Sequence, residues 1–162
     1  MTRTQEKTRT KANLSQVVEH LNRMIADNIV YYQKVRHYHW NIIGDQFFPL
    51  HAVFEQEYET TSEVIDLLAE RVRALGQIPL HTLDAALSAT NLEEDEAVPV
   101  QKEMVRRAAN DLARMVAEMN NIHQVMEEAN DYGSTNMIED LIEKTEKRIW
   151  MLRSFLGEPI RT

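Results

Sequence analysis

The sequence predicts an all-α fold, in which four long helices form a bundle and one long crossover joins the second helix to the third. Two observations carry this prediction. The 162 residues include only 4 Gly and 4 Pro, so turns are few and the elements between them must be long. Apolar residues recur at spacings of three and four along four stretches, which is the period of an amphipathic helix. A chain of this length forms one domain with a core large enough to fold alone.

The first two stretches predict an antiparallel helical hairpin. Residues 14–42 have helical spacing without an internal Gly or Pro, and Gly44 follows as a stop signal. Residues 49–75 form the second stretch, with apolar side chains alternating by three and four, and Gly76 lies at its stop position. Because the link between these helices is short, they are expected to run in opposite directions.

Residues 77–98 predict the long crossover. They contain Pro79 and an acidic run at residues 93–96, and a short helix is expected around Leu83–Ala89. A link of this length can run along the whole bundle, so the second and third helices are expected to be parallel. Ferritin-like folds share this arrangement.

The last two stretches predict a second antiparallel hairpin. The third helix covers residues 99–126 and begins at a proline, which suits a first helical turn. Gly133 is expected to break the chain, and Ser134 or Thr135 to cap a fourth helix that ends before Gly157.

Charge is distributed unevenly along the chain. The net charge of -8 makes a globally basic nucleic-acid binder unexpected, but residues 1–12 carry +3 and leave -11 on the rest. We therefore expect a mobile basic tail over residues 1–12, a bundle domain over residues 13–157 and a short C-terminal tail over residues 158–162. A basic tail can hold a polyanion such as DNA, although short polar tails often only add solubility. The basic residues of the tail are Arg3, Lys7, Arg9 and Lys11.

Several classes of protein are excluded by what the sequence lacks. Cysteine is absent, which excludes disulfides, thiolate catalysis, iron–sulfur clusters and cysteine-based zinc sites. No apolar stretch approaches 18 residues, so no membrane partner is expected. The polar N-terminus lacks the apolar core of a signal peptide, and the sequence therefore predicts a cytoplasmic protein.

A strip of carboxylates indicates where metal chemistry could occur. Five acids of the second helix fall in one sector beside His51: Glu55, Glu59, Glu63, Asp66 and Glu70. A solvated face is the commonest explanation of such a strip, and the alternative is that cations neutralise it. Carboxylate and imidazole ligands together suit Fe(II), Mn(II) or Zn(II). His39 lies on the apolar stripe of the first helix, where a lone histidine is more often a core residue than a ligand.

The usual di-iron site within one bundle is not expected. Such sites carry a Glu-x-x-His pair on each of two helices, and the residue three before each of the six histidines is never Glu. The second helix also lacks the Met that would bind haem as in bacterioferritin, so no haem is expected. A metal site in this chain must therefore be built differently.

The pattern of residues on the first two helices resembles the Dps family of miniferritins (DNA-binding protein from starved cells). The matching residues are His39-Trp40-Asn41, Gly44, Phe47, His51, Glu55 and the run from Asp66 to Arg71. The intervals of 12, 15 and 4 residues between His39, His51, Asp66 and Glu70 match the family's ferroxidase motif throughout. The run Ile149-Trp150-Met151-Leu152 also looks like that family, and the resemblance covers residues 13–157.

The resemblance implies a ferroxidase centre between two subunits that are related by a twofold axis. The residues that it assigns to the metal are His39, His51, Glu55, Asp66 and Glu70. The two histidines would come from one chain, and Asp66 and Glu70 from its neighbour. Trp40 would lie close to the centre, although packing is its simpler role. His37 lies on a different helix face, and we expect it at the surface or behind the metal ligands.

The resemblance also implies a hollow homo-oligomeric shell of twelve chains. Such a shell would oxidise Fe(II), preferably with hydrogen peroxide, and store a ferric mineral, so that DNA is protected from oxidative damage. Iron is the expected metal, and zinc could occupy the same site. Acids that could line a pore or the cavity are Glu127, Glu128, Asp131, Glu139 and Asp140. DNA binding through the tail would add a nucleoid association, and a bundle with another metal or none remains the alternative.

Overall fold

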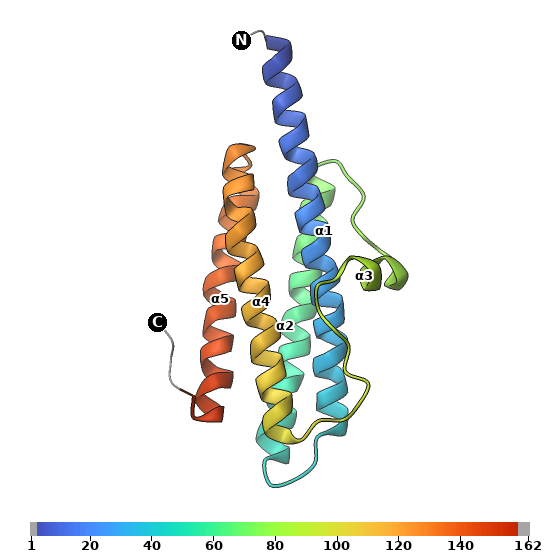
Figure 1. Cartoon of the computed structure of the whole chain (residues 1–162), viewed down its shortest axis with the longest axis vertical. Coiled ribbons are helices and arrows are strands. Elements are labelled where there is room, and N and C mark those ends of the chain that lie inside the picture. Colours follow the sequence, from blue (N-terminus) through green and yellow to red (C-terminus); the bar gives the residue numbers. More distant parts are fainter. Residues whose placement is uncertain (1–2, 159–162) are drawn as a thin grey trace.

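The computed structural model describes the backbone of residues 3–158 and the side chains of residues 13–158. Its elements are α1 (Arg3–Asn41), α2 (Phe47–Ala74), α3 (Leu83–Ala89), α4 (Gln101–Glu128) and α5 (Tyr132–Leu156). The four long helices lie side by side, and the short α3 lies against α1 on one flank (Figure 1). The predicted all-α bundle is therefore confirmed. None of the helices in the described part of the chain has both the length and the apolar character needed to cross a membrane.

The direction of the chain alternates within two hairpins, α1 with α2 and α4 with α5. The crossover that carries α3 then descends along the bundle, so that α4 starts at the same end as α2 and runs parallel to it (Figure 1). This confirms the connection expected from the length of the link, and α3 has the bounds expected from the sequence.

Most helix boundaries lie within two residues of the prediction, but α1 begins at Arg3 rather than near Leu14. No Gly or Pro occurs between these positions, so nothing in the backbone stops the helix. The side chains of Arg3, Lys7, Arg9 and Lys11 lie outside the described residues. The basic tail as a mobile segment therefore stays a prediction.

The start of α5 differs from the prediction. Its cap is Asp131 and not Ser134 or Thr135, because the Asp131 carboxylate accepts a hydrogen bond from the backbone N–H of Ser134 at 3.2 Å. Gly133 lies inside the helix and does not break the chain. A Cβ atom at this glycine would lie 2.8 Å from the guanidinium of Arg71. The glycine thus makes room for an arginine of α2.

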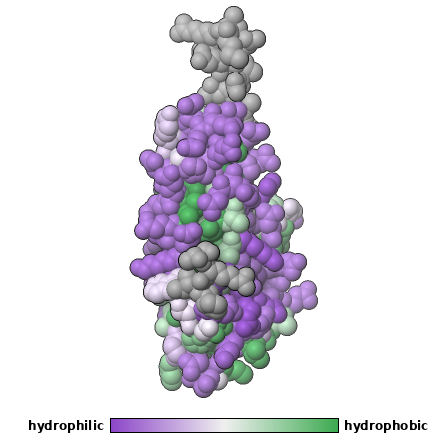
Figure 2. All heavy atoms as spheres, turned by 60° about the vertical axis from the view of Figure 1, so that its left-hand side comes forward, coloured by the Kyte–Doolittle hydropathy of each residue, from purple (hydrophilic) through white to green (hydrophobic). Residues whose placement is uncertain are grey.

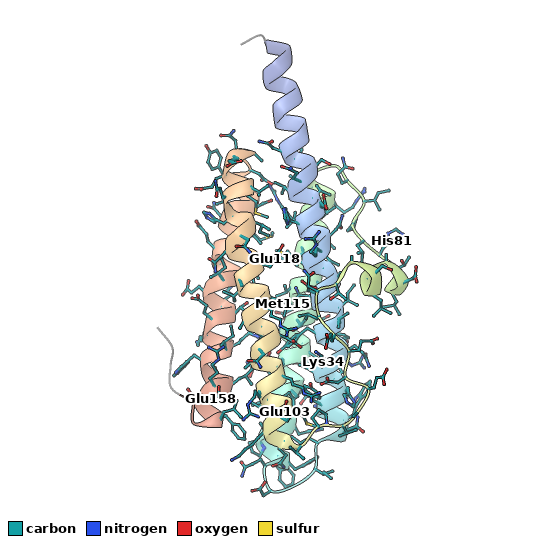
Figure 3. The ribbon with its side chains drawn as sticks, viewed as in Figure 1. Lys34, His81, Glu103, Met115, Glu118 and Glu158 are labelled. Carbon is teal, nitrogen blue, oxygen red and sulfur yellow. The ribbon has the colours of Figure 1, made fainter. Side chains whose placement is uncertain are left out.

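Two of the buried polar clusters in the core join the long helices. In the first, Lys34 of α1 donates from Nζ to Oδ2 of Asp111 in α4 at 2.5 Å. Both side chains are buried, and Figure 3 shows Lys34 inside the molecule. A buried charge needs a partner of this kind because its desolvation is costly. The pair therefore fixes α1 against α4.

The second cluster joins α1, α2 and α5 around the buried Glu57. Arg148 donates from Nη2 to Oε2 of Glu57 at 2.6 Å and to Oγ1 of Thr61 at 3.1 Å. The hydroxyl of Tyr31 donates to Oε2 of Glu57 at 2.8 Å. Burial raises the pKa of Tyr31 well above its ordinary value, and the Glu57 carboxylate raises it further. Together the two clusters link all four long helices and make α1 and α2 a rigid support.

Candidate metal centre

His39 and His51 meet where α1 ends and α2 begins. Nδ1 of His39 lies 2.9 Å from the backbone carbonyl oxygen of His51, and Nδ1 of His51 lies 2.9 Å from the backbone carbonyl oxygen of His39. The two rings stack, with centroids 3.7 Å apart and an interplanar angle of 20°. The pair is thus held by two reciprocal hydrogen bonds as well as by ring contact.

These hydrogen bonds fix which nitrogen of each ring can bind a metal. A carbonyl oxygen only accepts, so each Nδ1 must carry a hydrogen, and the neutral imidazole then keeps its lone pair on Nε2. Among residues 13–158, no group forms a hydrogen bond to Nε2 of His39 or His51. A backbone acceptor on the distal nitrogen is the usual way in which proteins orient a metal-binding histidine. The two side chains therefore have the orientation that is usual for metal-binding histidines.

The loop between α1 and α2 sets the position of this pair. Gly44 has φ 116°, a conformation that side chains with a Cβ rarely adopt. A Cβ atom there would also lie 2.5 Å from Nε2 of Gln101, which donates to the carbonyl oxygen of Ile43 at 2.7 Å. Phe47 begins α2 and stacks on His51 with centroids 5.0 Å apart. Gly44 and Phe47, both part of the sequence pattern, therefore act as supports for the histidines.

The carboxylates of the acidic strip lie at the surface of α2. Glu55 is one helical turn beyond His51, and its Oε1 lies 3.4 Å from the hydroxyl of Tyr58. Asp66 and Glu70 are exposed as well. They follow His51 by 15 and 19 residues, which places them about 22 Å and about 28 Å further along the helix. One chain therefore cannot bring them to the ion that its own histidines would bind.

The structure accordingly brings together only part of the predicted set. His39 and His51 are in contact, Glu55 is adjacent, and Asp66 and Glu70 are distant. Within the part of the chain whose side chains are described, no group of three or more His, Cys, Asp or Glu residues could hold a metal ion. The single chain therefore brings together the two histidines and leaves Asp66 and Glu70 away from them.

An arginine and several aromatic rings flank His39. The ring of Tyr58 meets it edge-on at 5.3 Å between centroids. The Arg36 guanidinium carbon lies 4.8 Å from the ring centroid of Trp40, 5.2 Å from that of Tyr32 and 5.8 Å from that of Tyr58. Trp40 leaves 56% of its surface exposed, so it is not packed as a core residue. Desolvation raises the pKa of Tyr58, and neighbouring carboxylates raise it further, so the phenol stays protonated at neutral pH.

His37 contacts the crossover rather than the histidine pair. Its Nε2 donates to the carbonyl oxygen of Ala97 at 3.3 Å, and Nδ2 of Asn41 lies 3.0 Å from its Nδ1. Both ring nitrogens are therefore engaged away from the histidine pair.

Arg71 ends the run that resembles the family, but its contacts were not foreseen from the sequence. It pairs with the carboxylate of Asp131 and donates from Nε to the hydroxyl of Ser134 at 2.9 Å. Asp131 is buried and engaged in these contacts, so its carboxylate is not available to line a pore. The run Asp131-x-Gly133-Ser134, with a cap and a glycine, was the signal that could have indicated this clamp.

The other acids considered for a pore are exposed. Glu139 accepts from Nε2 of His123 at 2.9 Å, and Glu127 lies 3.8 Å from Nδ1 of the same ring. The two carboxylates thus meet opposite nitrogens of one histidine and do not converge on one point.

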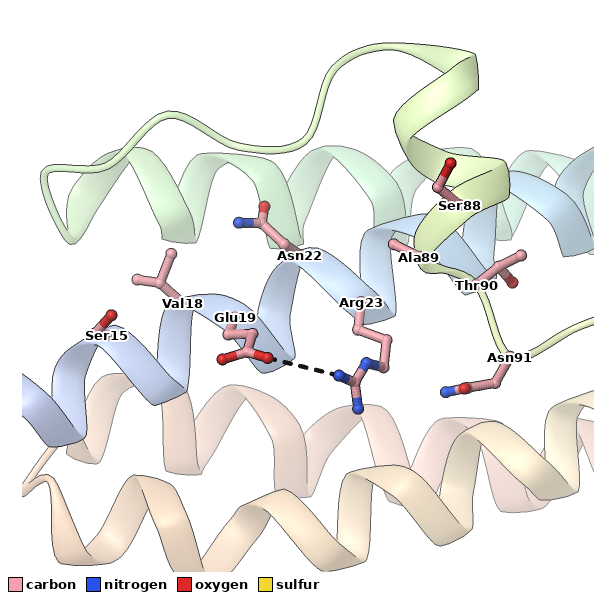
Figure 4. Close-up of a pocket in the computed structure, with 9 residues that line it drawn as sticks. All are labelled: Ser15, Val18, Glu19, Asn22, Arg23, Ser88, Ala89, Thr90 and Asn91. Atoms are coloured by element: carbon pink, nitrogen blue, oxygen red, sulfur yellow. Dashed lines mark ion pairs between the residues drawn. The ribbon is translucent and has the colours of Figure 1, made fainter.

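A groove of about 690 Å³ is lined by residues of α1, of the end of α3 and of the segment that follows α3 (Figure 4). Among its lining residues the one carboxylate is Glu19, which pairs with Arg23 at 3.7 Å. The lining contains no histidine, so this groove does not compete with the histidine pair as a metal centre.

Exposed apolar side chains occur at the end of the bundle near the histidine pair and on α5. Among them are Trp40, Ile43, Phe48, Trp150, Met151 and Phe155. In the face shown in Figure 2, hydrophilic residues dominate, and apolar residues gather in the middle and at the end away from the N-terminus. Surfaces of this kind mark contacts with other protein surfaces when they are contiguous.

Comparison with known proteins agrees with the fold. A model of the ferritin-like domain matches residues 18–161. A DNA protection during starvation protein of Brevibacillus brevis is 37% identical over 147 residues, which cover 90% of this chain and 99% of that protein. A crystal structure of a Dps protein from Vibrio cholerae, described as a ferritin-like diiron-carboxylate protein, superposes with a TM-score of 0.87 at 30% identity and covers 90% of this chain and 91% of its own.

A Dps structure from Listeria innocua that was soaked with zinc has a TM-score of 0.84 at 27% identity, and it covers 86% of this chain and 95% of its own. The matches extend along nearly the whole of both chains and include the helices that carry the histidine pair. The chain therefore belongs to the Dps family of the ferritin-like superfamily.

Proposed function

We propose that this protein oxidises Fe(II) and stores the ferric product, at a metal site that two copies of the chain complete together. The observation that carries the proposal is the His39–His51 pair, which is locked through both Nδ1 atoms and open at both Nε2 atoms. Across a twofold axis, each copy contributes the same residues to the site of the other copy. Asp66 and Glu70 of one copy would then meet the histidines of the other. Iron storage and DNA protection at the family level support this function.

The ligand set accounts for the direction of the reaction. Imidazole nitrogen and carboxylate oxygen both bind Fe(II), and hard oxygen ligands stabilise Fe(III) more. Hydrogen peroxide is the preferred oxidant in this proposal: two Fe(II) ions each give one electron, and peroxide takes two electrons and two protons to form two waters. Because both electrons come from iron held at one site, no hydroxyl radical is released. Glu55, beside His51, would provide a further carboxylate for the iron.

Storage requires an enclosed space, and a shell of twelve copies would provide it. The exposed apolar residues near the histidine pair and on α5 supply surface for association. The net charge of -11 on residues 13–162 would draw cations inward and help a ferric mineral to nucleate.

Loading with iron tests the site, the shell and the mineral together. Fe(II) and hydrogen peroxide are added to the metal-free protein, the oxidation rate is followed by absorbance, and particle size and iron per particle are then measured. We expect a particle of about twelve chains with many more iron atoms than sites. In the double variant His51→Ala, Asp66→Ala we expect the particle to assemble and rapid oxidation to be lost. Zinc binds the same kinds of ligand but has no redox chemistry, so it should inhibit the wild type.

A matched control is the double variant His81→Ala, Glu146→Ala, which removes the same kinds of side chain from exposed positions elsewhere. It should oxidise iron like the wild type. An unchanged oxidation rate in the His51, Asp66 variant would refute the site assignment, and a particle that stays monomeric or dimeric would refute storage.

DNA binding is the second function that we propose, and it rests on the charge of residues 1–12. Four basic residues, Arg3, Lys7, Arg9 and Lys11, give this segment +3 against an acidic body. A single such tail binds weakly, but twelve tails on one particle act together. Contacts to phosphate would dominate, so binding should fall steeply with salt. If protein lacking residues 1–12 retards DNA at low salt as well as the full chain does, the tail is not the binding element.

A further inference from the structure

Asp95 differs from the other acids of the run at residues 93–96, which lies in the crossover just before α4. Its side chain leaves only 10% of its surface exposed, whereas the other three acids of the run are exposed. The Asp95 carboxylate accepts a hydrogen bond from the hydroxyl of Tyr38 and another, at Oδ1, from Nη1 of Arg107 at 2.8 Å. One acid of the crossover is thus held between α1 and α4.

Tyr38 connects Asp95 to both helix ends that carry the histidines. It lies directly before His39 in the last turn of α1 and is fully buried. Its ring meets that of Phe54 edge-on, with centroids 5.4 Å apart, and Phe54 follows His51 by three residues near the start of α2. Burial and the hydrogen bond to the carboxylate raise the pKa of Tyr38, so the phenol keeps its proton and is the donor.

The crossover is anchored on both sides of Asp95 as it runs down beside α1 (Figure 1). Before it, the buried Asp27 of α1 accepts from the hydroxyl of Thr90 at 2.7 Å. After it, the carbonyl oxygen of Ala97 lies 3.3 Å from Nε2 of His37. The position of the Asp95 carboxylate is therefore set by a segment that is itself fixed on α1.

We propose that Tyr38 and Asp95 are positioning residues, which together hold the last turn of α1 so that His39 keeps its orientation toward His51 for metal binding. The end of a helix frays because its last carbonyl groups lack partners within the helix. The hydrogen bond to Asp95 restrains this turn from outside, and the ring contact with Phe54 ties it to α2. The role in metal binding rests on the proposed function. The restraint itself is buried within one chain, so a second copy that covers the site leaves it in place.

Tyr31 provides a matched control, because it lies seven residues, about two turns, before Tyr38 on the same helix. Both tyrosines are fully buried, and each donates its hydroxyl to one carboxylate, Tyr31 to Glu57 and Tyr38 to Asp95. Tyr31→Phe and Tyr38→Phe therefore delete the same group from similar surroundings. A merely structural role predicts the same result for both variants, whereas a positioning role predicts an effect on the histidine pair in Tyr38→Phe alone.

The first measurement uses the full-length metal-free protein and does not depend on iron chemistry. Hydrogen–deuterium exchange, measured by mass spectrometry on peptides that cover residues 35–44, reports the opening of the last turn of α1. In Tyr38→Phe we expect these amides to exchange about tenfold faster than in the wild type, the factor that corresponds to the loss of one hydrogen bond to a charged group. In Tyr31→Phe they should exchange at the wild-type rate.

The second measurement is the affinity for Co(II), which accepts imidazole and carboxylate ligands and reports its binding through visible absorption. Tyr38→Phe should bind Co(II) about tenfold more weakly than the wild type, the lower limit of what the loss of a residue behind a metal ligand costs. Tyr31→Phe should bind it like the wild type. Asp95→Ala should weaken binding at least as much as Tyr38→Phe, and the double variant should lose no more than Asp95→Ala alone, because both changes remove the same hydrogen bond.

His51→Ala separates a failure of this inference from a failure of the metal site. If the wild type binds Co(II) no more tightly than His51→Ala, the proposed site is refuted, and the positioning role with it. If the wild type binds more tightly than His51→Ala and Tyr38→Phe matches the wild type, the positioning role is overturned while the site stands. Unchanged exchange in Tyr38→Phe would also overturn it. So would equal changes in Tyr31→Phe and Tyr38→Phe, because the hydroxyl would then support the bundle and not the histidine pair.

Discussion

The interior of the bundle and the histidine pair at its end differ in how their polar groups are hydrogen-bonded. Inside, Glu57 accepts from Tyr31 and Arg148, and Lys34 is paired with Asp111, so each buried charge has a partner in the same chain. At the surface, the histidine rings are fixed on one side and open on the other.

This difference indicates how a bundle can lack an internal metal site and still keep polar groups in its core. The buried cations of Lys34 and Arg148 neutralise the buried carboxylates of Asp111 and Glu57. In our proposal, coordination takes place at the surface of α1 and α2, where a second chain can reach it. The interior is complete within one chain, whereas the proposed site at the surface pair needs the neighbour.

The largest expected effect comes from breaking the interior. Replacing Arg148 with Ala leaves Glu57 buried without its cation, and removing one partner of a buried pair costs about 3–5 kcal/mol. The midpoint of urea unfolding, compared at one protein concentration, measures this loss. Lys144→Ala removes the exposed partner of Asp140 and is the control, in which the midpoint should scarcely move. Similar shifts in the two variants would mean that the interior cluster is not the stronger support.

A smaller effect is expected where α2 meets the turn before α5. In Gly133→Val the new side chain would collide with the Arg71 guanidinium, and overpacking of this kind costs about 1–3 kcal/mol. Arg71→Ala also loses its contacts to Asp131, but it removes the collision. The double variant should therefore be more stable than the sum of the two single losses predicts. Simple additivity in calorimetric or urea unfolding would contradict the clamp.

Loss of a surface histidine should affect stability less than either change. In His39→Ala one hydrogen bond to the His51 carbonyl and the ring stacking disappear, at a cost of about 1 kcal/mol. Helix content by circular dichroism should stay unchanged while iron oxidation is lost. A loss of stability as large as that of Arg148→Ala would make the histidine a core residue, as a lone histidine on an apolar stripe often is.

The smallest effect concerns pH. Hydrogen bonds from Arg107 and Arg106 lower the pKa of Glu103 below its ordinary 4.5. The stability that this carboxylate contributes is present above pH 4.5 and is lost as pH falls through its lower folded-state pKa. Glu103→Gln should thus be slightly less stable than the wild type at pH 7, by less than about 1 kcal/mol, and the difference should shrink as the carboxylate becomes protonated in acid. A difference that stays unchanged through acid titration would assign the effect to something other than the charge.

The fold was predictable from the sequence because long helices leave a strong periodic signal and few turn residues. The crossover and α3 followed from the length of one link and its acidic run. The cap of α5 was not foreseen, because Gly133 was interpreted as a break when its function is to accommodate Arg71 from another helix. Such a contact joins residues far apart in sequence, and periodicity does not report it.

Part of the candidate site's arrangement was predictable from the sequence. The pattern that resembles the Dps family pointed to His39 and His51, and the structure brings these two residues into contact. The reciprocal bonds through backbone carbonyls could not be foreseen, because they depend on the angle between two helices. Arg36 was also missed, since a cation over several rings has no sequence signature beyond its spacing from Tyr32 and Trp40.

The central claim is that the metal site is shared between two chains, and mixed assemblies test it most directly. One variant chain carries His39→Ala with His51→Ala, and the other carries Asp66→Ala with Glu70→Ala. Each alone should lack rapid iron oxidation. In a dimer that contains one chain of each kind, the intact histidines of one chain would face the intact carboxylates of the other. Co-expressed particles should therefore recover about a quarter of the wild-type rate if the chains pair at random. Mixed particles that contain both chains but show no recovery would contradict a shared site.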